Sequence, residues 1–297
     1  MPIQNPHAGA HYALDIGGSP VGSLKSISGL DMLADIALTS PGPGEMPGKH
    51  VANVRWTPGK ATVGMGMGKG MYEWMKASFA QGASLASGTL ATGDFNFKER
   101  SLLTFSDALL TAITLPRLDG SSKEPGAFEI EFAPERVRAS AGDGSDIRGG
   151  VGSRQQPWLC SNFRFELGSL PCARVASIES FTWRCTPPAA AVFQPPPSTI
   201  EVPDLRVAIS AADYDAWAQA AQRWFIDGNH LEGDEMSGMI TLLAPDLQTP
   251  LGAIALGNVG FKRFSQLPSA GGGDALYRFT VDLYVERMSL QLLQYEG

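Results

Sequence analysis

A glycine-rich run at Gly64–Gly70 is the segment of this chain whose residue types most invite a chemical role. It reads GMGMGKG, and glycines allow backbone N–H groups to approach a phosphate closely. Its spacing fits neither GxxxxGK[ST] nor GxGxxG, and Lys69 is followed by Gly70 instead of a hydroxyl residue. The sequence therefore favours a flexible segment that leads into a helix over a nucleotide site.

Residues that commonly bind metals or act as nucleophiles are few and scattered. The histidines are His7, His11, His50 and His230, and the cysteines are Cys160, Cys172 and Cys185. They form no CxxC pair and no His–Cys cluster with ligand spacing. Glu129 and Glu131 alternate along one strand, which is typical of a solvated or lumen-facing strand. We therefore expect no catalytic residue, no cofactor and no metal, and a protein that is not an enzyme.

Composition indicates a β-rich protein with a partly covered surface. The chain has 297 residues, about twice the commonest domain size, so two domains are the natural expectation. The 34 glycines and 21 prolines favour turns and short strands. Charged residues make up only 18%, which suits a surface that neighbouring molecules cover.

The charge pattern excludes several classes of partner. The net charge is −7 and no long Lys/Arg cluster occurs, so we expect no sequence-specific binding of nucleic acid. No apolar run is long enough to span a membrane. The first residues lack a charged segment followed by an apolar one. We therefore expect a protein that is cytoplasmic before it assembles.

Two pairs of segments repeat at one fixed offset. Tyr12–Leu30 (YALDIGGSPVGSLKSISGL) aligns without a gap with Phe163–Phe181 (FRFELGSLPCARVASIESF), 151 residues further on. We call this spacing the repeat offset, and Phe128–Val137 (FEIEFAPERV) aligns with Phe279–Met288 (FTVDLYVERM) at the same spacing. Alternating strands are common in β-proteins, but they do not explain a shared offset. The sequence therefore predicts a tandem duplication.

The duplication sets the expected domain boundaries. The first domain covers residues 1–140 and the second covers residues 158–297. Residues 141–157 between them are rich in Gly and Ser and poor in apolar residues, as expected of an exposed linker.

Each half is expected to contain several strands, one arm and one helix. Strands are predicted at 12–16, 24–30, 51–56, 102–105, 108–116 and 127–134, then at 239–244, 252–262 and 277–287. Apolar residues at helical spacing predict helices over 69–81 and 212–226. The core residues of these helices are expected to include Trp74, Phe79, Trp217 and Phe225. Arms at 31–48 and 186–201 are rich in Pro and Gly, which should prevent regular pairing within a sheet.

Four sequence features, and the order in which they occur along the chain, resemble the T4-like phage tail tube family. This family also supplies the inner tubes of contractile injection systems. They are Ser26–Leu30 (SISGL), the run from Met46–His50 to Val54–Gly59, the aromatic helix at Tyr72–Trp74 and the strand Phe128–Phe132. The resemblance covers nearly all of the first half. It covers only the ends and helix of the second half, which lacks the Pro-Gly motif.

The resemblance implies β-sandwich or barrel domains, each with one packed helix, whose sheets join side to side into six-fold rings that stack through long arms. The predicted function is a structural subunit of a phage-like tail tube or an injection-system inner tube. One alternative is a baseplate hub, tube initiator or tube end that forms a single ring. Another is a soluble β-barrel binding or effector protein.

The expected partners follow from this function. The chain should bind itself, as a homotrimer with pseudo-six-fold symmetry or as a hexamer, and then tube, sheath or baseplate proteins within a tail or injection particle. DNA or protein cargo could pass through the lumen. Contacts between rings are expected at Leu33, Ile36, Leu38, Pro47 and Gly48.

Overall fold

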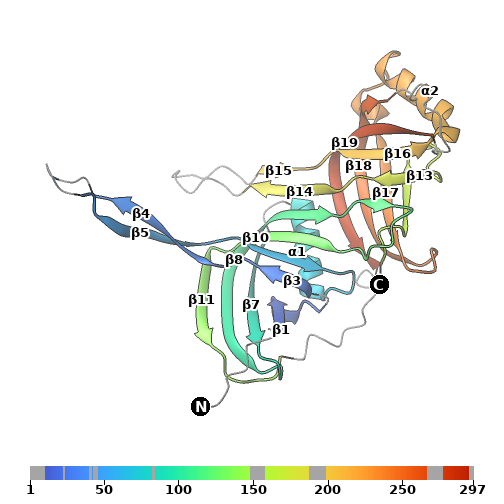
Figure 1. The fold of residues 1–297 in the computed structure, drawn as a ribbon. Coiled ribbons are helices and arrows are strands. Elements are labelled where there is room, and N and C mark those ends of the chain that lie inside the picture. The colour runs from blue at the N-terminus through green and yellow to red at the C-terminus, as the bar shows by residue number, and fades with distance from the viewer. Residues whose placement is uncertain are drawn as a thin grey trace.

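The computed structural model describes residues 11–22, 24–39, 42, 46–81, 84–147, 158–186, 199–265 and 277–293. Strands dominate these residues, and one α-helix lies in each half (Figure 1). The strands form two large curled sheets and one two-stranded ribbon. The prediction of a mainly β fold with one helix in each half is confirmed. No helix among these residues has the length and apolar character needed to cross a membrane.

The first sheet is antiparallel and follows the order β2-β1-β7-β8-β10-β6-β3. Its strands are β1 (His11–Ile16), β2 (Ser19–Pro20), β3 (Leu24–Ser28), β6 (Gly59–Val63), β7 (Leu85–Gly93), β8 (Glu99–Leu115) and β10 (Phe128–Ala133). Next to β8 lie β11 (Arg136–Ala141) and a strand from the second half, β14 (Phe181–Thr186), which also pairs with β15 (Thr199–Glu201). The first sheet is therefore built from both halves of the chain.

The second sheet follows the order β12-β17-β18-β19-β16-β13-β9. Its strands are β12 (Phe163–Leu167), β13 (Val175–Ile178), β16 (Leu205–Ser210), β17 (Met236–Leu243), β18 (Pro250–Phe264) and β19 (Arg278–Leu292), with β9 (Leu118–Asp119) from the first half. Without the short strands β2 and β9 at their ends, β1-β7-β8-β10-β6-β3 and β12-β17-β18-β19-β16-β13 have the same order. One strand topology thus occurs twice.

Local irregularities of the backbone also recur at the repeat offset. A bulge interrupts the pairing of β10 with β8 between Glu131 and Phe132, and the pairing of β18 with β19 has its counterpart between Phe261 and Arg263. Asp107 and Asn258, which are separated by the same offset, both have a φ of 53°. Such left-handed conformations are uncommon outside glycine, so the two halves share details of backbone geometry as well as strand order.

The strand β8 replaces two predicted strands. The sequence separates 102–105 from 108–116, but Glu99–Leu115 is continuous. Asp107 takes the left-handed conformation without ending the strand, and its carboxylate forms an ion pair with Arg136 of the neighbouring β11. The interruption at Ser106–Asp107 is therefore a bend within one long strand.

The first arm is a β-ribbon in which β4 (Met32–Leu38) pairs with β5 (Lys49–Trp56), and it extends away from the sheets (Figure 1). The expectation that Pro and Gly would prevent regular pairing here is wrong for residues 32–38. The reason is positional, because the prolines and glycines of this arm lie beyond Leu38, between the two strands. Most of the second arm, residues 187–198, lies outside the described residues.

The helices are α1 (Lys69–Gln81), as predicted, and α2 (Tyr214–Phe225), which follows a short 3₁₀ turn at Ala211–Asp213. Trp74 and Phe79 of α1 are buried, as is Trp217 of α2, but Phe225 is 44% exposed. The buried apolar residues of both halves form one continuous cluster. Residues 148–157 of the predicted linker lie outside the described residues.

Candidate assembly interface

The glycine-rich run is packed inside the protein. Met65 and Met67 are buried. A β carbon at Gly68 would lie 1.9 Å from the Pro20 carbonyl oxygen, and one at Gly70 would lie 2.3 Å from the Ile16 carbonyl oxygen. These glycines therefore let the start of α1 approach the β1–β2 turn. The prediction of a flexible segment is wrong, because Met65 and Met67 anchor it in the core.

The chemically reactive residue types remain dispersed. Among the described residues, no group of three His, Cys, Asp or Glu side chains is placed to hold a metal ion. Burial raises the pKa of the Cys172 thiol to about 11, so this thiol is protonated at neutral pH. Glu131 forms an ion pair with Lys60 of the adjacent strand, Nζ to Oε1 2.7 Å, on an exposed face of the sheet. His7 lies outside the described residues.

The most distinctive contact is the pairing of β14, from the second half, with β8, from the first. The pairs run from Phe181 opposite Leu115 to Arg184 opposite Ala112. Because β10 already occupies one edge of this part of β8, β14 takes the other edge. That edge is free because β7 pairs with β8 only as far as Leu109. The second half thus extends the sheet of the first.

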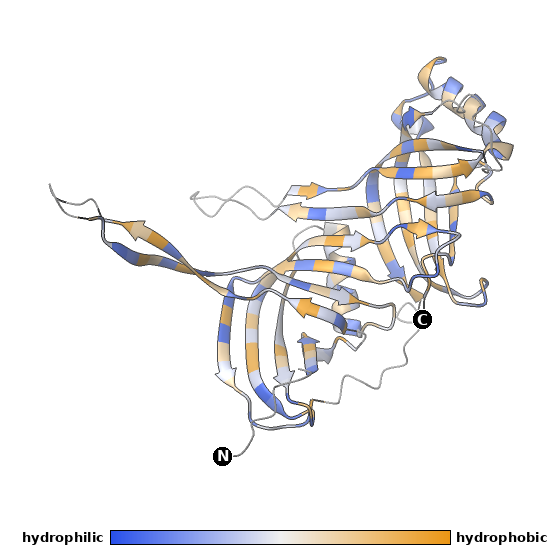
Figure 2. Cartoon of the chain, viewed as in Figure 1, coloured by the Kyte–Doolittle hydropathy of each residue, from blue (hydrophilic) through white to orange (hydrophobic). Residues whose placement is uncertain are grey.

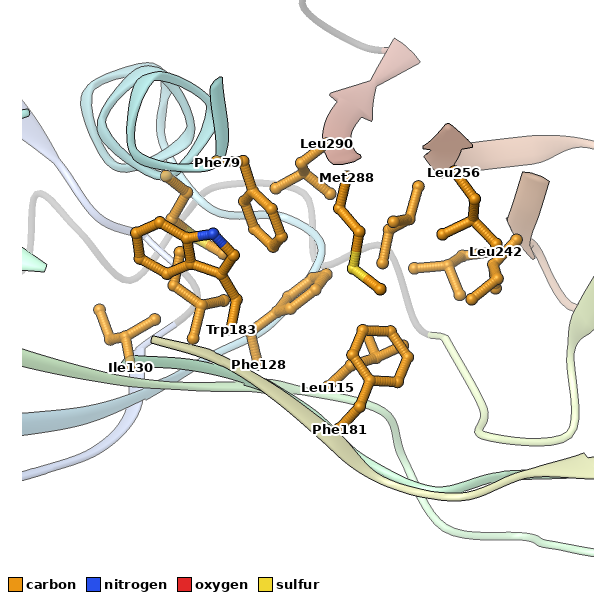
Figure 3. Packing of buried hydrophobic residues seen from close by; sticks show 14 of the residues in the cluster. Phe79, Leu115, Phe128, Ile130, Phe181, Trp183, Leu242, Leu256, Met288 and Leu290 are labelled. Carbon is orange, nitrogen blue, oxygen red and sulfur yellow. The ribbon is translucent and has the colours of Figure 1, made fainter. Parts of the chain in front are cut away.

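The pairing of β14 with β8 is reinforced by side-chain contacts. Trp183 of β14 is fully buried and packs against Phe79 of α1, with ring centroids 5.6 Å apart (Figure 3). The hydroxyls of Thr182 and Thr114 lie 2.8 Å apart and share a hydrogen bond. The contact therefore combines backbone pairing with an aromatic anchor, the combination expected where strand addition gives affinity and pockets give specificity.

Two further contacts hold the same joint. The short β9 of the first half pairs with β13 of the second half, Leu118 opposite Ile178. The helix α1 packs against β19, and Figure 3 shows Phe79 facing Met288 and Leu290 of that strand. We call these three contacts, β14 with β8, β9 with β13 and α1 with β19, the internal joint. They join the two sheets edge to edge.

The first arm has no such cover. Met32 is 66% exposed and Leu38 is 65% exposed. Leu33 and Ile36 are also exposed, and so are Pro47 and Gly48 at the far end of the ribbon. There the Thr39 N–H donates to the Gly48 carbonyl oxygen at 3.0 Å. Figure 2 shows apolar residues along this ribbon. Exposed apolar residues gathered on one element typically mark an interaction site.

The sequence matches no protein-family model and no curated protein. The fold is similar to the anti-feeding prophage cap (AFP tube terminating cap), with 22% identity over 48% of this chain and 95% of that chain and a TM-score of 0.42. It is also similar to a chain of the PVC sheath-tube complex in the extended state, an extracellular contractile injection system, with 20% identity over 47% of this chain and 94% of that chain and a TM-score of 0.40.

The role of β14 as the strand that joins the two halves was not predicted from the sequence. Phe181, Trp183 and Cys185 alternate with polar residues, and this period indicates a strand with one buried face. The alternation was sufficient to find the strand. It contains no information on which sheet the strand joins.

Proposed function

We propose that this chain is a structural subunit of a phage-like tail tube or of the inner tube of a contractile injection system. The observation that carries the proposal is the internal joint, in which β14 of one half pairs with β8 of the other. A tube wall is made by repeating one edge-to-edge contact between sheets, and this chain contains one such contact already. The sequence resemblance to tail tube proteins points to the same role.

The proposal includes two copies of one tube-forming unit in each chain. It is supported by the shared strand order, the shared bulge and the left-handed residues Asp107 and Asn258 at equivalent places. We place the units at residues 1–140 and 158–297. The first unit gives β9 to the sheet of the second unit, and the second unit gives β14 and β15 to the sheet of the first.

A ring of three chains follows from this arrangement. The internal joint leaves the first unit with an unused arm at one end and the second unit with an unused sheet edge at the other. A head-to-tail contact of this kind generates a closed ring when the rotation per subunit allows it. With six units in the ring, as the resemblance implies, three chains close it with pseudo-six-fold symmetry, and the alternative is a ring of six chains.

The outer part of the first arm would then reach the adjacent ring. We assign this role to Ile36, Leu38, Pro47 and Gly48, with Leu33 nearer the base of the arm. Replacement of residues 36–46 by a short Gly/Ser turn should leave rings intact and abolish stacking, because the sheet contacts do not include the outer part of the ribbon. Loss of the rings themselves would show that this outer part is also needed within a ring.

Native mass spectrometry and negative-stain microscopy of the purified chain test the proposal. A three-chain assembly with a central hole is expected, and a six-chain ring would exclude the trimer. Tubes would support a tube-body subunit, and isolated rings would support a hub, tube initiator or tube end. A stable monomer at micromolar concentration would contradict all of these and favour a soluble binding protein.

A further inference from the structure

We propose that β4 of one chain adds to the free edge of β18 in a second copy of this chain, in the register used by the internal joint. The inference rests on the proposed function, because it specifies the contact between chains in the ring. The partner is a second copy because two contacts of the internal joint, β14 with β8 and α1 with β19, have equivalents elsewhere in the chain that are uncovered among the described residues.

The acceptor edge is found by moving along the repeat. β14 pairs with Ala112–Leu115 of β8, and the residues one repeat offset later begin at Arg263 of β18. The equivalence of the two strands is supported by their shared bulge. At this bulge Ala112 pairs with Glu131 in the first unit, and Arg263 pairs with Asp282 in the second. Arg263 lies one repeat offset after Ala112, and Asp282 lies one repeat offset after Glu131. The position that receives β14 in the first unit is therefore Arg263–Ser265 in the second.

This edge of β18 is open. β17 pairs with β18 only as far as Val259, while β19 takes the other edge through Phe264. Within the described residues, no strand pairs with Phe261–Phe264 on the β17 side. Ala112 and Ile113, which pair with β14, are buried. Arg263 is exposed, and Phe264 is only half-buried. The same strand position is covered in one unit and open in the other.

The donor strand is found in the same way. Trp183 of β14 lies one repeat offset after Met32, and Arg184 lies one repeat offset after Leu33. One edge of β4 is taken by β5, which pairs Met32 with Trp56. Its other edge has no strand partner among the described residues. Trp183 is fully buried, whereas Met32 is 66% exposed. Met32 thus stands at the position of the Trp183 anchor, but no neighbouring surface covers it among the described residues.

The register carries over pair by pair. Trp183 lies opposite Ile113 and Arg184 lies opposite Ala112 in the internal joint. The equivalent pairs between chains are Met32 opposite Phe264 and Leu33 opposite Arg263. In this register the Met32 side chain takes the place of Trp183, and the backbone groups of two exposed edges become paired.

The helix contact of the internal joint also has an uncovered equivalent. α1 packs against β19 at Met288 and Leu290, and the residues one repeat offset earlier are Val137 and Ala139 of β11. Val137 is half-buried and Ala139 is exposed. On the other unit, the C-terminal end of α2 exposes Phe225 by 44% and the following Ile226 by 77%. These surfaces meet when β4 joins β18, because α1 and β19 meet when β14 joins β8.

A charge substitution tests whether the base of the arm holds the ring. Met32→Asp should raise the protein concentration for half-assembly at least tenfold, since it places a carboxylate in the proposed pocket. The far-UV spectrum and melting of the dissociated chain should not change, because Met32 is exposed in a single chain. Met46→Asp is the matched control, because Met46 is 94% exposed at the far end of the ribbon, and it should leave ring formation unchanged. A Met32→Asp variant that forms rings as well as the control would overturn the inference.

Cysteine cross-linking tests the register itself. Met32→Cys combined with Phe264→Cys places two thiols on directly opposite residues, where β carbons lie about 4.5–5.5 Å apart. Oxidation of assembled rings should give covalent dimers and trimers on a denaturing gel. The control pair, Ile36→Cys with Phe264→Cys, lies well off register and should not cross-link. Rings that form without the Met32–Phe264 cross-link, or that link both pairs equally, would refute the inference and leave the proposed function standing. Failure of the unmodified chain to form rings would refute both.

Discussion

The strands β4 and β14 cover equivalent positions of the repeat, yet their surroundings are opposite. β14 is paired with β8, and its Trp183 is fully buried, whereas β4 stands on the free ribbon with Met32 exposed. The difference arises from chain continuity, which brings the second unit beside the first but offers the first unit no neighbour on its other side. An uncovered strand edge has unpaired backbone N–H and C=O groups that can pair with a strand of another chain. The paired strand β14 therefore displays the contact that β4 lacks.

The two helices show the same contrast. α1 lies between its own sheet and β19 of the second unit, and its Phe79 is buried. α2 packs mainly on β18, and Phe225 at its C-terminal end is exposed. Among the described residues, α1 at the joint is thus covered on two sides, and α2 is covered mainly on one.

The largest expected effect comes from removing Trp183, the aromatic anchor of β14. Trp183→Ala should lower the free energy of unfolding by about 3–5 kcal/mol, because it leaves a large cavity beside Phe79. Urea denaturation measures the loss, and hydrogen exchange should show reduced protection in both β8 and β14. Met46→Ala, a change at an exposed methionine, should alter stability by less than about 0.5 kcal/mol. A Trp183→Ala loss as small as that of Met46→Ala would mean that the internal joint contributes little to folding.

Removing a core tryptophan from one unit tests whether the units fold separately. Trp217 is fully buried, and its indole N–H donates to the Pro171 carbonyl oxygen at 2.9 Å. Trp217→Ala should cost about 3–5 kcal/mol and reduce hydrogen-exchange protection mainly in its own unit. Trp74→Ala is the matched variant in the first unit, where the indole N–H donates to the Ser84 carbonyl oxygen at 2.9 Å. Equal loss of protection from β1 and β12 in either variant would show one cooperative core and end the two-domain assignment.

The smallest expected effect concerns the left-handed residue shared by β8 and β18. Asn258→Ala and Asn258→Gly both remove the hydrogen bond from Arg287, so their difference isolates the backbone. The alanine variant should be less stable by about 1 kcal/mol, because an L-residue with a β carbon disfavours this conformation. The same order is expected for Asp107→Ala and Asp107→Gly. A difference of one sign at Asn258 and the opposite sign at Asp107, measured by thermal unfolding, would break the proposed equivalence of the two strands.

Local patterns in the sequence were sufficient for much of the fold. The apolar spacing of Met71, Trp74 and Phe79 predicted α1 with its observed ends, and strand alternation located most of the long strands. These signals are reliable because helices and half-buried strands impose periods of 3.6 and 2 on the residues that face the core. The repeat offset also predicted positions that have the same backbone geometry in both halves.

The candidate interface was harder to predict from the sequence. Leu33, Ile36 and Leu38 were predicted to be contact residues, but their ribbon was expected to be irregular. Trp183 was not singled out, and Phe225 was grouped with the core although it lies at an exposed helix end. An apolar residue on a strand or helix needs a neighbouring surface to be buried, and the residue pattern of one element does not name that surface.

The mainly β character, the positions of the two helices and the repeat could be predicted from the sequence, since each depends on the order of residues along a short stretch or on direct comparison of two stretches. The folded structure was needed to show that β14 joins β8, that β9 joins β13 and that β4 has one unpaired edge among the described residues. Strands pair through backbone N–H and C=O groups, which are nearly the same in every residue. The choice between possible edges is therefore made by which edges the folded chain brings together and leaves open.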